Sequence, residues 1–142
     1  MSAGIANEGA KVIFDLVNKG SSVDRGTDLE LGLFTNTDDF ATLIGLPLSS
    51  ITEPTGGSYA RKTLTDASWD NSASRMSSYA KQTFTATGGA MTGTIYGFFI
   101  ATTGTTPRLK AIIKPETMNA GITLAEGSSV SYTPKETLTT PV

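Results

Sequence analysis

The chain of 142 residues contains neither histidine nor cysteine. Without imidazole there can be no Ser–His–Asp triad, no Cys–His dyad and no histidine-ligated zinc site. Without thiols there can be no disulfide, thiolate metal site or cysteine nucleophile, and the redox compartment stays undetermined. We therefore expect a protein that is not an enzyme, binds no cofactor or metal, and takes its stability from packing or from partners.

Charge and long apolar runs are also scarce. Charged residues make up 17% of the chain, and the net charge is −2 with both signs scattered, so no basic patch of the kind that binds nucleic acid is formed. No apolar run reaches the roughly 18–20 residues of a membrane span, and the first residues do not resemble a signal peptide. These features predict no nucleic-acid or membrane partner, and a protein kept in the cytosol until it assembles.

Small polar residues take the place of charge, since the chain holds 23 Thr, 14 Ser and 15 Gly. Threonine suits the pleated, half-wet face of a strand, while Ser and Gly favour turns. Roughly six to eight short strands are expected at spacings near ten residues. The sequence therefore predicts a mainly β fold, a β-sandwich or jelly-roll-like domain over residues 1–133, with an extended tail over 134–142.

One helix is expected ahead of the strands, over about residues 5–18. Asn7 is available as a cap and Glu8 is favourably placed in the first turn, while Gly20 suits a left-handed helix end. A helix of this length is not stable alone and must dock on the rest of the domain. Its apolar residues fall roughly on one face: Ile5, Val12, Ile13, Leu16 and Val17.

Two apolar segments, residues 28–36 and residues 40–48, lead to different predictions. In residues 28–36, Leu29, Leu31 and Leu33 alternate with other residues, which predicts a strand with one apolar face. Residues 40–48 are apolar but contain Gly and Pro, and helix, strand and covering loop all stay open. Further strands are expected over residues 58–65, 79–87, 109–114, 122–124 and 130–133.

The most apolar segment is residues 92–102, which is hydrophobic on both faces of a strand. This predicts either a central strand buried on both sides, or a strand with one face in the core and the other against a partner. Gly88-Gly89 precedes it and predicts a hairpin with the strand over residues 79–87.

Few residues suggest a binding site. Asp38 and Asp39 are adjacent, which favours a turn or helix cap over a cation site. Trp69 and the four tyrosines could form a sugar-stacking platform, although aromatic residues spread over several strands are more often core and rim residues.

Several short motifs follow one another along the chain: IANEG (5–9), LGLFTN (31–36), ITEP (51–54), GGSYAR (56–61), ASW (67–69), TFTAT (83–87), IYGFFI (95–100) and NAGITL (119–124). Taken in this order, they resemble segments of small virion proteins of tailed bacteriophages. The resemblance covers residues 5–133, and its motifs are turn and core residues, which specify a fold better than a function.

The resemblance implies a structural virion protein, first of all a capsid cement or decoration protein. Such a protein would lie on the capsid surface after assembly in the host cytoplasm, as a homo-oligomer such as a trimer, and bridge subunits of the major capsid protein. The alternative is a tail, tail-fibre or adhesin component that binds another tail protein or a host receptor, with a glycan site near Trp69.

The excess of apolar residues in one strand and the unpatterned chain ends indicate where partners would bind. The residues predicted to form contact surfaces are Ile5, Tyr96, Phe98, Phe99, Pro134, Leu138 and Pro141.

Overall fold

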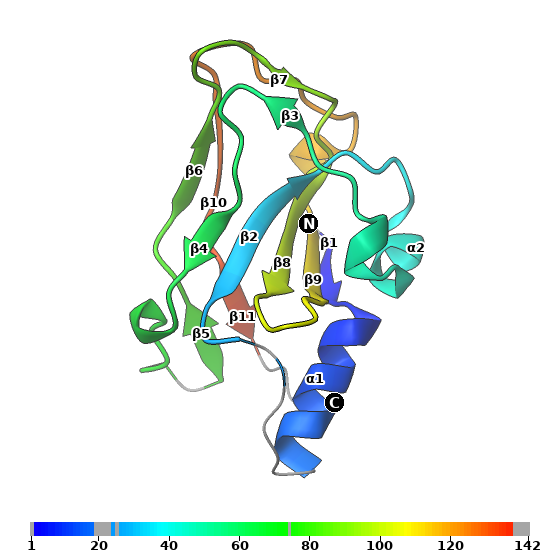
Figure 1. The fold of residues 1–142 in the computed structure, drawn as a ribbon, viewed down its shortest axis with the longest axis vertical. Helices are drawn as coiled ribbons and strands as arrows, with labels where there is room; N and C mark the ends of the chain where they lie inside the picture. The colour runs from blue at the N-terminus through cyan, green and yellow to red at the C-terminus, as the bar shows by residue number, and fades with distance from the viewer. Residues whose placement is uncertain (1, 19–23, 25, 74, 138–142) are drawn as a thin grey trace.

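A computed structural model describes residues 2–18, 24, 26–73 and 75–137 of the protein (Figure 1). The predicted mainly β fold is confirmed. The elements in chain order are β1 (Ser2–Ile5), α1 (Asn7–Asn18), β2 (Leu29–Phe34), α2 (Phe40–Gly45), η1 (Leu48–Ser50), β3 (Thr55–Gly56), β4 (Lys62–Leu64), η2 (Asp66–Ser68), β5 (Met76–Ser78), β6 (Gln82–Thr85), β7 (Met91–Thr92), β8 (Gly97–Thr102), β9 (Leu109–Lys114), η3 (Glu116–Met118), β10 (Ser129–Tyr132) and β11 (Lys135–Thr137).

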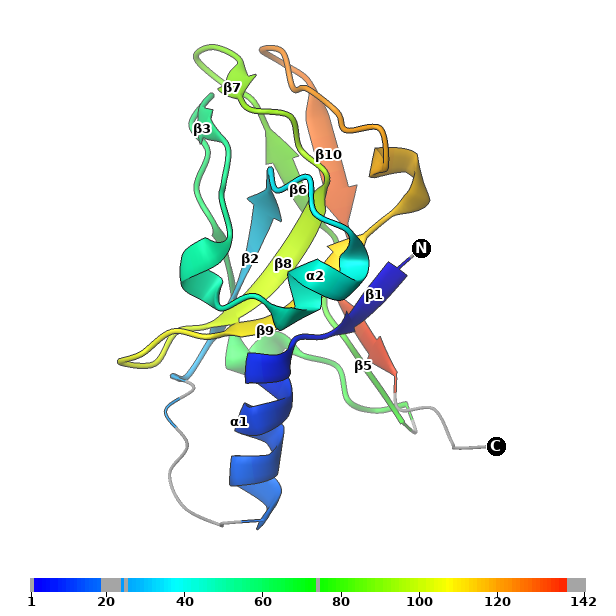
Figure 2. The same cartoon turned by 90° about the vertical axis from the view of Figure 1, so that its right-hand side faces the viewer.

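An antiparallel sheet of five strands in the order β1-β9-β8-β2-β4 forms the centre of the molecule. Three further antiparallel pairs, β6–β10, β5–β11 and β3–β7, are separate from it. Figures 1 and 2 show β6 and β10 on one side of the five-stranded sheet and α2 on the other. The second β layer is therefore built from short pairs rather than from one continuous sheet.

Each face of the central sheet carries its own core. The strand-covered core lies under β6 and β10, and the helix-covered core lies under α2. The buried residues of the strand-covered core are Leu29, Leu31, Leu33, Leu64, Phe84, Ala86, Met91, Ile95, Phe98, Ile100, Ile113, Met118 and Leu124. Those of the helix-covered core are Ala6, Phe34, Leu43, Ile51, Phe99, Ala101, Leu109 and Ile112.

Strand β8 contributes to both cores, which resolves the two possibilities for the apolar segment. Phe98 is 1% exposed in the strand-covered core, and Phe99 is 0% exposed in the helix-covered core. The chain itself therefore buries both faces of this strand. The prediction that Phe98 and Phe99 form a contact surface is wrong, because neither ring reaches the surface.

Gly32 in β2 makes room for one of these rings. A Cβ atom at Gly32 would lie 2.3 Å from Cζ of Phe99 on the neighbouring strand, far inside van der Waals contact. Any larger residue here would displace the Phe99 ring from the helix-covered core.

The hairpin predicted at Gly88-Gly89 is wrong. Strand β6 before this turn pairs with β10, where Phe84 lies opposite Val130, and β7 after the turn pairs with β3. The two glycines do turn the chain, both with positive φ. The strands that they join find more distant partners, because sheet pairing follows the burial of whole faces as well as local turn chemistry.

The predicted boundary of the tail is also wrong. Pro134 is buried, its carbonyl accepts a hydrogen bond from the Tyr79 N–H at 2.9 Å, and β11 pairs with β5. The folded part therefore extends past Thr133 and includes β11, Lys135–Thr137. Leu138 and Pro141 lie outside the described residues.

The predicted N-terminal helix is confirmed as α1, and the undecided segment forms α2 and η1. Asp39 caps α2, because its Oδ1 accepts a hydrogen bond from the Thr42 N–H at 2.8 Å. None of the helices in the described residues has the length and apolar character needed to cross a membrane.

Candidate functional site

Strand β1, which precedes α1, forms one edge of the central sheet (Figure 2). It pairs with β9, and Ala6 continues this pairing because its N–H donates to the Lys110 carbonyl at 2.9 Å. In an antiparallel pair, backbone groups alternate between facing the partner and facing away. The N–H and C=O groups of Ala3 and Ile5 therefore face away from β9, and no strand of the described residues pairs with them.

This edge carries no charge and little bulk. Its sequence is Ser-Ala-Gly-Ile, without the lysine or proline that commonly protects an edge strand. Ile5 is 48% exposed. Among the residues whose side chains the structure describes, it is the one large hydrophobic residue that is exposed. Among the predicted contact residues that the structure describes, Ile5 is the one that lies at the surface in an apolar setting.

An apolar groove of about 340 Å³ runs beside β1 on the side of the strand-covered core. Ala3 and Ile5 lie opposite Ile113 and Ala111, so these four side chains share one face and form its floor. Helix α1 and the β10–β11 segment border the groove. We call it the β1 groove, lined by Ala3, Gly4, Ile5, Ile13, Ile100, Ala111, Ile112, Ile113, Tyr132, Lys135, Glu136 and Thr137.

Glu8 holds the junction of β1 and α1 against the sheet. Its Oε2 accepts hydrogen bonds from the N–H of Leu109 at 2.8 Å and from the N–H of Leu48 at 3.2 Å. One carboxylate therefore satisfies backbone donors from two distant segments. The sequence indicated only a favourable place for Glu8 in the first helical turn, because a bond across about a hundred residues leaves no local pattern.

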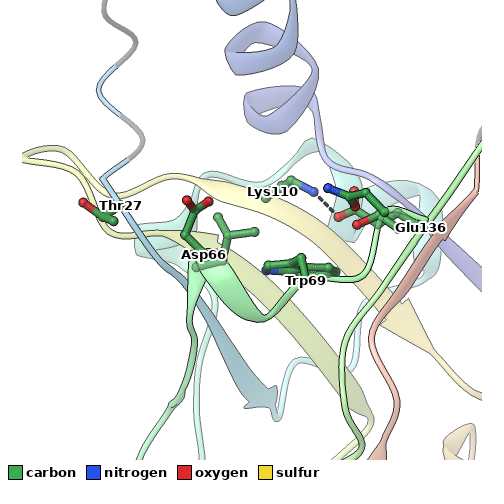
Figure 3. A pocket seen from close by; sticks show the side chains of 8 residues that line it. Thr27, Asp66, Trp69, Lys110 and Glu136 are labelled. Atoms are coloured by element: carbon green, nitrogen blue, oxygen red, sulfur yellow. Dashed lines mark hydrogen bonds and ion pairs between the residues drawn. The ribbon is translucent and has the colours of Figure 1, made fainter. Parts of the chain in front are cut away.

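Lys110 of β9 forms an ion pair with Glu136 of β11, and Glu136 lines the groove. It links the five-stranded sheet to the β5–β11 pair. Glu136 also lines a second hollow, which is polar and has a volume of about 160 Å³ (Figure 3). We call it the Trp69 pocket, lined by Thr27, Leu29, Asp66, Trp69, Asn71, Ser77, Lys110 and Glu136.

The Trp69 pocket combines a flat aromatic surface with charged and polar groups. Trp69 is half-buried and meets Tyr79 edge-on, with 5.3 Å between the ring centroids. Figure 3 shows Trp69 between Asp66 on one side and the Lys110–Glu136 pair on the other. An indole surface flanked by hydrogen-bonding groups can bind a small polar ring such as a sugar.

The opposite edge of the sheet, at β4, is surrounded by charge. Arg61 binds Glu53 through Nε and Nη2, the latter at 2.7 Å, and binds Glu30 through Nη1 at 3.1 Å. The Tyr59 hydroxyl donates to Glu53 at 2.5 Å and accepts from the Leu33 N–H at 3.0 Å. Burial, followed by the bond to Glu53, raises the pKa of Tyr59 well above its ordinary value.

Within the part of the chain that the structure describes, the other predicted contact residues do not gather into one surface. Tyr96 is half-buried against the helix-covered core, and Pro134 is buried beside β5. The sequence missed β1 as a strand, the β1 groove and the polar residues around Trp69. Ala111 and Ile113 were predicted in a strand, but nothing local indicated that β1 would pair with that strand and that a groove would lie beside the pair. The described residues contain no group of three or more acidic side chains placed to hold a metal ion.

Compared with known proteins, the sequence matches no protein-family model and no curated protein. The resemblance to virion proteins therefore rests on the sequence motifs described above.

Proposed function

We propose that the protein is a non-catalytic structural component of a bacteriophage particle, bound at the capsid surface and holding neighbouring subunits together. The observation that carries this proposal is the β1 edge. It combines an uncharged strand, two residues whose backbone groups face away from the sheet, and an apolar groove beside them.

An open strand edge can bind a partner without any specialised chemistry. A partner strand gains main-chain hydrogen bonds from the edge, and side-chain pockets beside the edge add selectivity. One short edge gives a small interface, well under the roughly 800 Å² per partner of a stable complex. Repetition over a shell supplies the avidity that a single contact lacks.

Binding to particles tests this proposal. The purified protein is mixed with capsids that lack it, and the bound fraction is measured by co-sedimentation for the wild type, Ile5→Lys and Thr63→Lys. Thr63 is exposed on the opposite edge strand, so it provides a matched control for the added charge. We expect the wild type and Thr63→Lys to bind in a copy number near that of the major capsid protein, and Ile5→Lys to bind at least tenfold more weakly. Absence of wild-type binding, together with unchanged heat resistance of particles that lack the gene, would contradict the proposal.

The Trp69 pocket favours a second candidate, a tail or adhesin component that binds a host receptor. A half-buried indole beside Asp66, Asn71 and Lys110 has the chemistry that recognises a sugar ring. This function predicts a low copy number in the particle and binding to host cell-surface glycans that Trp69→Ala abolishes. Tyr96→Phe is the control, because Tyr96 lies against the helix-covered core. Glycan binding that is equal in both variants, or absent in the wild type, would remove this candidate.

A further inference from the structure

We propose that β1 binds β1 of a second copy of this chain, antiparallel and about a two-fold axis, so that two sheets join into one. This inference rests on the proposed function, since it names a partner for the same contact edge. The β1 sequence and its register supply the argument.

The free edge of β1 is complementary to itself. Ala3 and Ile5 are the residues whose backbone groups face outward, and they are two positions apart around Gly4. With the two-fold axis at Gly4, Ala3 of one copy lies opposite Ile5 of the other, and the reverse pair forms by symmetry. Both are hydrogen-bonded pairs, so each exchanges two N–H···O bonds and about four form in all.

The side chains suit this register. Ala3 and Ile5 lie on the groove face of the sheet, and a two-fold axis perpendicular to the sheet keeps the two groove faces on the same side. Ile5 of each copy then packs beside the small Ala3 of the other, and part of its exposed surface is buried. No charged side chain lies on either β1, so pairing brings no like charges opposite one another.

The grooves of the two copies also become continuous. Their floors meet along the paired strands, so that Ala111 and Ile113 of each copy lie one strand away from the shared axis. Pairing through β1 therefore extends a surface that is already apolar.

A second copy fits this edge better than the chain's own C-terminal residues. β11 ends at Thr137 on the border of the groove, and the five residues that follow are Leu-Thr-Thr-Pro-Val. Pro141 has no N–H to donate, so this segment can extend the ladder along β1 only in a register in which Pro141 faces away from β1. A second β1 strand is not restricted in this way, because both of its outward-facing residues, Ala3 and Ile5, have an N–H to donate.

The small contact predicts a weak dimer. Two four-residue strands bury far less than the roughly 800 Å² per partner of a stable interface. We expect a dissociation constant on the order of 100 μM in dilute solution. Such a contact forms fully only at high local concentration, as in an assembled shell.

Sedimentation equilibrium over roughly 10–500 μM tests the proposal with five proteins: the wild type, Ile5→Lys, Ala3→Lys, Thr63→Lys and a chain ending at Thr137. Ala3 and Ile5 are both exposed, so either substitution can be made without burying charge. We expect the wild type, Thr63→Lys and the shortened chain to pass from monomer to dimer, and both β1 variants to dimerise at least tenfold more weakly. Circular dichroism melts check that each variant is folded.

Several results would overturn the inference. They are a wild type that stays monomeric at 500 μM, a trimer, equal dimerisation of Thr63→Lys and the β1 variants, or a shortened chain with altered dimerisation. A monomeric wild type that still binds capsids would remove the second copy as partner and leave the proposed function standing. A dimer that binds no capsid would remove the proposed function and leave the β1 pairing.

Discussion

The two edges of the five-stranded sheet are built in opposite ways. At β1 the edge is uncharged, and the backbone groups of Ala3 and Ile5 face outward beside an apolar groove. At β4 the edge is flanked by Arg61 and Lys62, and the Lys62 ammonium lies 5.4 Å from the centroid of the Phe84 ring. Charged side chains discourage strand addition, so one edge is protected and the other is open.

Two tyrosine hydroxyls complete the protection at β4. The Tyr59 hydroxyl accepts from the Leu33 N–H, which lies beyond the end of β4, and the Tyr79 hydroxyl accepts from the Thr65 N–H at 3.0 Å. Beyond the end of β4, these side chains therefore accept the backbone hydrogen bonds that a longer or further strand would otherwise accept. Nothing comparable is described at β1. The contrast teaches that an edge is closed by side-chain donors and acceptors as well as by charge.

The largest effect is expected from breaking the support of the β1 edge. Glu8→Ala leaves the N–H groups of Leu48 and Leu109 without their acceptor, and we expect it to lower the free energy of unfolding by about 3 kcal/mol. Urea denaturation measures the loss. Glu8→Gln keeps an acceptor oxygen and should lose no more than about half as much. Equal losses in the two variants would show that the carboxylate's charge, rather than its hydrogen bonds, provides the support.

A smaller effect is expected from opening the β4 edge. Tyr59→Phe removes the acceptor of the Leu33 N–H and the donor to Glu53, and we expect a loss of about 1–2 kcal/mol in the free energy of unfolding. Tyr79→Phe is the control, because its partner N–H at Thr65 is exposed and can bond to water. If Tyr59→Phe is as stable as the wild type, the hydroxyl does not protect this edge.

The same hydroxyl predicts a dependence on alkaline pH. The folded pKa of Tyr59 is raised by burial and by its bond to Glu53, so the folded state holds this proton more tightly than the unfolded state. The stabilisation is complete below the ordinary tyrosine pKa of about 10 and is lost progressively as the pH rises above it. Thermal melts from pH 8 to 11 should decline more steeply for the wild type than for Tyr59→Phe. Parallel declines would contradict the assignment.

The smallest effect is expected from adding charge to either edge of the isolated chain. Ile5 is 48% exposed and Thr63 is also exposed, so Ile5→Lys and Thr63→Lys should each change the free energy of unfolding by less than about 0.5 kcal/mol at 10 μM. We expect Ile5→Lys and Thr63→Lys to have similar free energies of unfolding but to differ in how strongly they bind a partner. A loss above 1 kcal/mol in Ile5→Lys alone would mean that Ile5 supports the fold of one chain rather than a contact.

Patterns in the local sequence predicted three elements of the fold, α1, β2 and β8. The amphipathic spacing before Gly20 predicted α1, the alternating leucines predicted β2, and the double apolar face of residues 92–102 predicted a strand suited to burial on both sides. In each case the residues that form the element also carry the signal. Composition was sufficient for the mainly β class, because threonine-rich sequences favour strands.

Elements defined by distant partners were not predictable in this way. Three of the four residues of β1 are small, and the strand shows no alternation of apolar and polar residues. It forms because β9 offers an edge about a hundred residues later. β11 likewise pairs with β5 across nearly sixty residues, which brought Glu136 beside Lys110 and Trp69. Long-range pairing set the candidate site, so the sequence named Ile5, Trp69 and the tyrosines but not the charged pair, Lys110 and Glu136, that lies beside them.

Residue-resolved amide hydrogen exchange on the wild-type protein tests the central claim most directly. At 10 μM, the account predicts that Ala3 and Ile5 exchange fast while Gly4, which faces β9, is protected. At 500 μM, or on the capsid, Ala3 and Ile5 should become protected while Thr63 at the opposite edge stays unchanged. Fast exchange of Ala3 and Ile5 under every condition would contradict the account, because an edge that binds a strand must protect these two amides.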